Sequence, residues 1–195
     1  MDSTSPSASA ASARNPPLNS WRLWYPREIV APWLISRLAL ILVAWLAMYL
    51  LQHMPRPGAW EIGAAGQVEP IPGAVSLRNP LVNMWSRWDA GWYHNVAEHG
   101  YNFSPDKPSN VAFFPVYPML LRATHAVVHS RKAIWWLVCG IIVSNAALLG
   151  CLIYLFLLAR LEFDEETARR AVLYLLIFPT TLFLSAVYSE SVFLL

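Results

Sequence analysis

Two long apolar runs constrain the fold of this chain more than any other feature of its sequence. They cover residues 29–51 and 134–159, and each provides the ~20 residues with which a helix crosses the hydrocarbon core of a bilayer. A signal peptide explains the first run less well, because its apolar part is only about 7 to 15 residues long. We predict a transmembrane helix in each run and a third, incomplete one over residues 171–195.

The composition excludes several classes of soluble protein. Hydrophobic residues make up 56% of the 195 residues and charged residues 13%, with a mean hydropathy of +0.39, whereas soluble domains carry about 25% charged residues. The formal net charge of +2 is too small for a nucleic-acid binder. Cys139 and Cys151 lack metal-type spacing, so no zinc site is predicted. We therefore predict an all-α, polytopic membrane protein.

The distribution of arginines sets the predicted orientation. Residues 1–28 are rich in Ser, Ala and Pro, and we expect a disordered tail. Three arginines precede the first span whereas only Arg56 follows it closely, so this tail is predicted to be cytoplasmic. Residues 160–170 also carry three arginines and are predicted to form a cytoplasmic loop. The segment 52–133 then lies outside.

The extracytoplasmic segment is predicted to contain two amphipathic helices at the membrane surface. One covers about residues 80–100. Its aromatic face consists of Trp85, Trp88, Trp92 and Val96, and its polar face of Arg87, His94 and Glu98. The other covers residues 111–129, where two prolines suit a first helical turn. Its Arg122 and His125 would face lipid headgroups.

Asp89 interrupts the aromatic face of the first of these helices. A carboxylate that is partly desolvated beside tryptophan rings becomes a stronger proton acceptor, which is what a general base requires. The same position also suits the cap of a helix that begins at Ala90, or an ion pair with Arg87. The spacing alone leaves the catalytic and the structural interpretation equally open.

Two further ionisable residues lie within predicted spans. Glu190 lies in the third and Arg37 about two turns into the first. An ionisable side chain inside a membrane is a candidate functional residue, although such residues also pair helices with one another. Arg37 has a further explanation, because its side chain can extend to the cytoplasmic headgroups.

Three blocks of sequence carry a resemblance to a known family. They are Trp88-Asp89 with Tyr93, Val96-Ala97 and Gly100-Tyr101; then Phe113-Phe114-Pro115-Val116-Tyr117-Pro118; and then Pro179 through Tyr188-Ser189-Glu190-Ser191. With these blocks in this order, the sequence resembles the PIG-V family of integral-membrane mannosyltransferases of the GT-C class. The resemblance extends from about residue 77 to residue 195. Because the chain stops inside an apolar run, we expect the N-terminal part of a longer protein, inactive by itself.

The resemblance implies a GT-C-like fold with an acidic active-site residue in the first extracytoplasmic loop, at Asp89. It also implies a polyprenyl-phosphate-linked mannose donor and inversion at the sugar carbon. Eukaryotic members act on a glycolipid-anchor precursor, but the lipid or protein acceptor of this chain is not identified.

In the mechanism we expect, Asp89 takes the proton of an acceptor hydroxyl, and Glu190 and Tyr188 support it or bind the acceptor. Arg87, His94 or Arg122 would stabilise the leaving phosphate. No cofactor and no metal site is predicted. A divalent cation near His94, Glu98 and Asp106 is only weakly indicated.

Two other classes of function stay open. A transporter or channel subunit would have Arg37, Asn145 and Glu190 on one connected interior face. A non-catalytic membrane scaffold would use the spans alone. The transferase predicts instead a cavity that is covered by the residue 85–100 helix and closed toward the cytoplasm.

Overall fold

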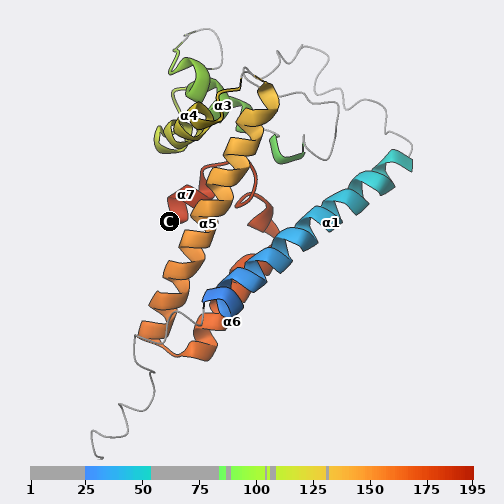
Figure 1. Cartoon of the computed structure of the whole chain (residues 1–195), viewed down its shortest axis with the longest axis vertical. Coiled ribbons are helices and arrows are strands. Elements are labelled where there is room, and N and C mark those ends of the chain that lie inside the picture. Colours follow the sequence, from blue (N-terminus) through green and yellow to red (C-terminus); the bar gives the residue numbers. More distant parts are fainter. Residues whose placement is uncertain (1–24, 54–83, 87–88, 104, 106–108, 131) are drawn as a thin grey trace, which may run out of the picture.

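The computed structural model describes residues 25–53, 84–86, 89–103, 105, 109–130 and 132–195 (Figure 1). Every regular element among these residues is a helix, which confirms the all-α class. In chain order they are η2 (Tyr25–Val30), α1 (Ala31–His53), η3 (Met84–Ser86), α3 (Ala90–His99), α4 (Val116–Val128), α5 (Ala133–Glu162), α6 (Glu165–Ile177), η4 (Pro179–Leu182) and α7 (Glu190–Leu194). The predicted tail over residues 1–28 lies almost entirely outside the described residues.

Two of the described helices are long and apolar enough to cross a membrane. They cover Arg27–Ala47 and Ile134–Glu162, where the sequence predicted spans over residues 29–51 and 134–159. The large apolar side chains of α1 are mostly exposed, as Leu38, Leu42 and Val43 show. The core helix of a soluble protein would bury such a face, so this exposure is compatible with a lipid surround.

The predicted loop over residues 160–170 is wrong in its extent. Helix α5 continues to Glu162 and α6 begins at Glu165, so only Phe163 and Asp164 separate the two helices. The apolar run stops at residue 159, but the α-helical backbone continues for three further residues because charged side chains are good helix formers. The cytoplasmic location of this connection stays a prediction.

The expected third helix over residues 171–195 is not continuous. Helix α6 ends at Ile177, and residues 178–189 form an irregular segment before α7 begins at Glu190. Pro179 explains the break, because it has no amide hydrogen for a helical bond and its ring disfavours the α conformation of Phe178. Phe178 is accordingly extended, with φ −61° and ψ 137°. A membrane crossing by this part of the chain stays a prediction.

The helices form two packed regions at opposite ends of α5. In Figure 1, α1 begins beside α6 and diverges from α5 toward the end where α3 and α4 lie; η2 and α6 pack against α5, whereas α4 packs against α5 near its N-terminal end and α3 packs against α4. The first region buries Ile29, Leu148, Leu152, Phe156 and Val172, among others. The second buries Tyr93, Tyr117, Leu137, Val187 and Tyr188, among others. The irregular segment therefore connects α6 in the first region to the second.

The N-terminus of α6 gives a prediction about stability. The Asp164 carboxylate accepts a hydrogen bond of 2.7 Å from the Thr167 amide, and this bond lowers the pKa of Asp164 below its ordinary value of 3.8. A lowered pKa means that the stabilisation is present above pH 3.8 and is lost as the pH falls through the lowered pKa. We expect Asp164→Ala to lower the thermal unfolding midpoint in detergent at pH 7, and the difference from the parent to disappear at acidic pH.

Asp164→Asn is the control for this prediction. Asparagine also caps helices but carries no titratable group. The Asp164→Asn protein should therefore unfold at nearly the parental temperature at pH 7, and it should lack the part of the acid destabilisation that comes from protonation of Asp164. Equal midpoints for the parent and Asp164→Ala at pH 7 would contradict the prediction.

Candidate active site

The candidate site forms where the irregular segment meets the N-terminal end of α3. The Val187 amide donates a hydrogen bond of 3.0 Å to the Trp85 carbonyl. The Tyr93 hydroxyl lies 2.6 Å from the Ser189 hydroxyl, although the two residues are 96 positions apart in sequence. These contacts bring two of the three blocks of the family resemblance together in space.

Asp89 and Glu190 are both exposed residues at this junction, and they lie near enough for the charge of Asp89 to act on Glu190. Partial burial raises the pKa of Glu190, and the charge of Asp89 raises it further. Burial also raises the pKa of the Tyr93 hydroxyl; its hydrogen bond to Ser189 opposes this, and the charges of Glu190 and Asp89 add to it. The charge of Asp89 therefore acts on Glu190, and the charges of both acids act on Tyr93.

Tyr188 belongs to the same cluster. Burial raises the pKa of its hydroxyl to about 12. A hydrogen bond with the backbone of Asp89 opposes this rise, whereas the charges of Asp89 and Glu190 add to it. Its main-chain carbonyl accepts a hydrogen bond of 3.2 Å from the Ser144 hydroxyl of α5. The structure thus brings together three of the predicted site residues, Asp89, Tyr188 and Glu190.

The surroundings predicted for Asp89 are wrong. Helix α3 begins only at Ala90, so Trp85 lies in the separate turn η3 and does not share a helical face with Asp89. Asp89 is exposed rather than desolvated by tryptophan rings. It occupies the cap position of α3, but its side chain makes no capping hydrogen bond. The carboxylate is therefore exposed and not engaged in capping, and its charge acts on Glu190.

The phosphate-binding residues predicted from the sequence are not assembled at this pair. His94 is buried and does not lie on an exposed polar face as predicted. Helix α3 contributes residues to two packed clusters, each with residues of α4 and α5, so more than one of its sides is covered. Its ring contacts Trp136, and its Nε2 lies 3.2 Å from Glu98 Oε2. Arg122 is exposed on α4, and Arg87 lies outside the described residues. No ion pair of Asp89 or Glu190 occurs within the described ranges.

Of the alternatives left open for Arg37, the structure favours pairing with another part of the fold over extension to headgroups. Its guanidinium donates hydrogen bonds to the Ser185 hydroxyl and, over 3.0 Å, to the Thr181 hydroxyl of the irregular segment. Sequence reasoning did not single out these two hydroxyl residues, although their spacing of four is the one that places side chains on a common side of a turn.

Asn145 of α5 joins this cluster through Ser185. The Ser185 hydroxyl donates to Asn145 Oδ1 over 3.2 Å, and Asn145 Nδ2 donates to the Ser185 carbonyl over 3.3 Å. Asn145 Nδ2 also donates to the Ile141 carbonyl over 2.8 Å. Three parts of the fold, α1, α5 and the irregular segment, therefore meet at one serine.

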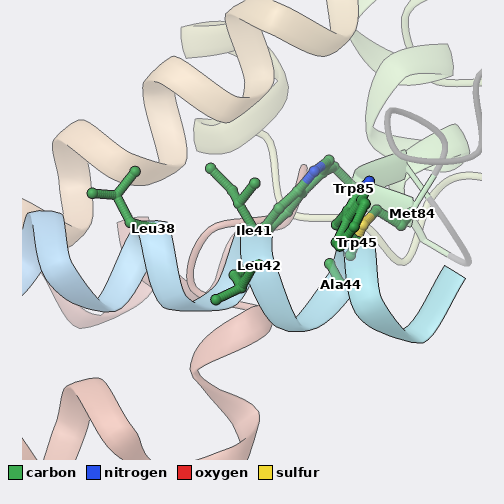
Figure 2. Close-up of a pocket in the computed structure, with 7 residues that line it drawn as sticks. All are labelled: Leu38, Ile41, Leu42, Ala44, Trp45, Met84 and Trp85. Carbon is green, nitrogen blue, oxygen red and sulfur yellow. The ribbon is translucent and has the colours of Figure 1, made fainter. Parts of the chain in front are cut away.

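An open groove lies between α1 and the rest of the molecule. Its apolar part has a volume of about 250 Å³ and is lined by Leu38, Ile41, Leu42, Ala44, Trp45, Met84 and Trp85 (Figure 2). An adjoining hollow of about 210 Å³ shares Ile41 and Trp85 and adds Arg37, Ile141, Asn145 and Ser185. The groove is thus apolar along α1 and polar at the Arg37 cluster.

The cation indicated only weakly by the sequence finds no ligand set in the part of the chain that is described. There, no three His, Cys, Asp or Glu side chains gather closely enough to hold a metal ion. Asp106, one of the three residues named for that cation, lies outside the described ranges.

Comparisons with known proteins support the family resemblance. The family described as mannosyltransferase (PIG-V) matches residues 28–195. The chain is 30% identical over 141 residues to GPI alpha-1,6-mannosyltransferase 2 of Mus musculus, an alignment that covers 65% of this chain and 26% of the mouse protein. The chain thus spans about a quarter of the length of that relative. No solved structure matches it.

Proposed function

The chain belongs to the mannosyltransferase (PIG-V) family, and from this premise we propose that the full-length protein moves a mannose from a polyprenyl-phosphate-linked donor to a hydroxyl acceptor outside the cytoplasm. The observation that supports this site most directly is the meeting of Asp89 with Tyr188 and Glu190. Residues about one hundred positions apart converge there through defined backbone and side-chain contacts.

The proposed chemistry uses the two acids differently. Asp89 accepts the proton of the acceptor hydroxyl while that oxygen attacks the anomeric carbon, the bond from this carbon to the phosphate oxygen breaks, and the configuration inverts. Glu190 lies within range of the charge of Asp89, and in its protonated form it would donate a hydrogen bond to a sugar oxygen. Tyr188 would bind the acceptor beside them. No metal or cofactor is part of this proposal.

The groove supports a lipid-linked donor. Its apolar part offers tryptophan and aliphatic side chains to an isoprenoid chain, and these come from α1 and from Met84 and Trp85 of η3 (Figure 2). A donor that already resides in the bilayer gains little from this apolar contact, so contacts to its headgroup must provide most of the specificity.

The arrangement of the helices supports the proposed sidedness. The η2 end of α1, with the arginines preceding it in sequence, meets the C-terminal end of α5, whereas α3 and α4 lie at the other end of this helix (Figure 1). A helix of this length spans a bilayer. If the N-terminus is cytoplasmic, the acid pair belongs nearer to the opposite face.

The donor is testable with the full-length protein in sealed membranes. We expect radiolabelled mannose to move from polyprenyl phosphate to the lipid or protein fraction, and no transfer from a nucleotide-linked mannose added in its place. Membranes without the protein are the control. Transfer from the nucleotide-linked donor alone would overturn the proposed donor class.

The transporter alternative is less well supported by the contacts. It requires Arg37, Asn145 and Glu190 on one connected face, and Ser185 does connect the first two. Glu190, however, lies with Asp89 at the end of the irregular segment. The hydrogen bonds of Arg37 and Asn145 within the described residues do not extend to Glu190, so the transferase remains the function we propose.

A further inference from the structure

The conformation of the irregular segment depends on bonds to other parts of the fold. Between Pro179 and Ser189 its own backbone forms only short turns, such as the bond from the Ala186 amide to the Leu182 carbonyl. Its anchors to other parts of the fold include Thr181 and Ser185 to Arg37, Ser185 to Asn145, Val187 to Trp85, Tyr188 to Ser144, and Ser189 to Tyr93. These bonds decide where Tyr188 and Glu190 lie.

Arg37 provides the one charged anchor of this segment in the described structure. A guanidinium presents several donors in a fixed plane, so it can bind two hydroxyls at once. Here it holds Thr181 and Ser185, one turn apart on the segment. Arg37 lies inside the candidate span Arg27–Ala47, where leaving a charge without partners is expensive. Detachment of the irregular segment from Arg37 would leave this charge without its two hydroxyl partners and is therefore unfavourable.

The geometry points to Arg37 as a positioning residue that holds the irregular segment so that Tyr188 and Glu190 meet Asp89. It does so through Ser185, which is fixed from the other side by Asn145. Ser185 lies only one turn before Ser189, the partner of Tyr93, so a shift at Ser185 is transmitted directly to the acid pair. This role rests on the proposed function, but the placement of the segment can be measured without it.

The activity test compares Arg37→Gln and Arg37→Lys in the full-length protein. A misplacement of about 1 Å can cost about 100-fold in rate, so we expect Arg37→Gln to lower kcat by about that factor while KM for the lipid-linked donor changes little. Arg37→Lys retains the charge but cannot hold both hydroxyls in a planar fork, so it should recover only part of kcat. Arg27→Gln, which changes an exposed arginine before α1, should retain parental activity.

A second readout is independent of mannose transfer. Asp89→Cys and Glu190→Cys introduced together place two thiols at exposed positions, while the native Cys139 and Cys151 are buried. A short bifunctional thiol reagent should link the introduced pair, and adding Arg37→Gln should slow linking about tenfold or more, because the effective concentration of one thiol near the other falls. Adding Arg27→Gln should leave the linking rate unchanged.

The two readouts separate the possible failures. Slower linking with no detectable mannose transfer by the parent would support the positioning role and overturn the proposed function. Unchanged linking in Arg37→Gln would overturn the positioning role, whatever the activity. An increase in KM for the donor with kcat retained would also overturn it, because Arg37 would then act on the donor rather than on the acid pair.

Discussion

Asp89→Asn is expected to lower mannose transfer by the full-length protein about 100- to 10,000-fold, the range that a general base typically contributes. The amide is close in size to the carboxylate but does not accept the proton of the acceptor hydroxyl. Asp89 is exposed and its side chain makes no capping bond, so the fold loses little by the change. We expect normal amounts in the membrane and a thermal unfolding midpoint near that of the parent.

Two further variants make this result specific. Glu190→Gln retains a hydrogen-bond donor of similar shape, so it should reduce transfer much less than Asp89→Asn if Glu190 acts in its protonated form. Glu162→Gln changes an exposed carboxylate at the distant end of α5 and should leave transfer unchanged. Retained turnover in Asp89→Asn would remove the general base from the proposed mechanism. A larger loss in Glu190→Gln than in Asp89→Asn would exchange the roles of the two acids.

The sequence predicted the parts of this fold that depend on local patterns. The apolar runs correspond to α1 and α5, and the helix predicted over residues 111–129 corresponds to α4, which begins five residues later, at Val116. Asp89, Tyr188 and Glu190 were selected from the family resemblance and from the cost of a charge in an apolar setting, and the structure brings all three together. Their selection needed no knowledge of the tertiary contacts.

The errors concern properties that only packing decides. His94 looked polar because a helical wheel considers one buried face, whereas α3 has neighbours on more than one side. The sequence left the role of Arg37 open between function, helix pairing and extension to headgroups, because its partners, Thr181 and Ser185, are more than 140 positions away. One helix was predicted over residues 171–195, but α6 ends at Ile177, just before Pro179, and bonds from Arg37 and Asn145 hold the irregular segment that follows.

Gly140→Ala is expected to destabilise the protein by overpacking the contact between α5 and the irregular segment. A Cβ atom on this residue of α5 would lie 2.7 Å and 2.9 Å from the two methyl carbons of Val187 and 3.3 Å from the Tyr117 hydroxyl. Val187 is 3% exposed and its amide is bonded to the Trp85 carbonyl, so it has little room to move. Overpacking of this kind costs about 1–3 kcal/mol, more than the gain of about 1 kcal/mol from replacing a helical glycine by alanine.

Gly150→Ala provides a matched control on the same helix. Its new Cβ would meet the end of the Leu195 side chain at 2.8 Å, but that side chain is 53% exposed and can rotate away. We therefore expect Gly150→Ala to retain or raise the thermal unfolding midpoint in detergent, whereas Gly140→Ala lowers it. Because Val187 precedes Tyr188, Gly140→Ala should also reduce mannose transfer by displacing the irregular segment from α5.

Val187→Ala tests whether this contact is the cause. The substitution removes both methyl carbons that the new Cβ would meet, so the double variant should lose less stability than the sum of the two single losses. It should also regain part of the transfer activity, because the segment can again approach α5. Strictly additive losses, or a Gly140→Ala midpoint as high as that of Gly150→Ala, would show that the close approach of Val187 to α5 does not position Tyr188 and Glu190.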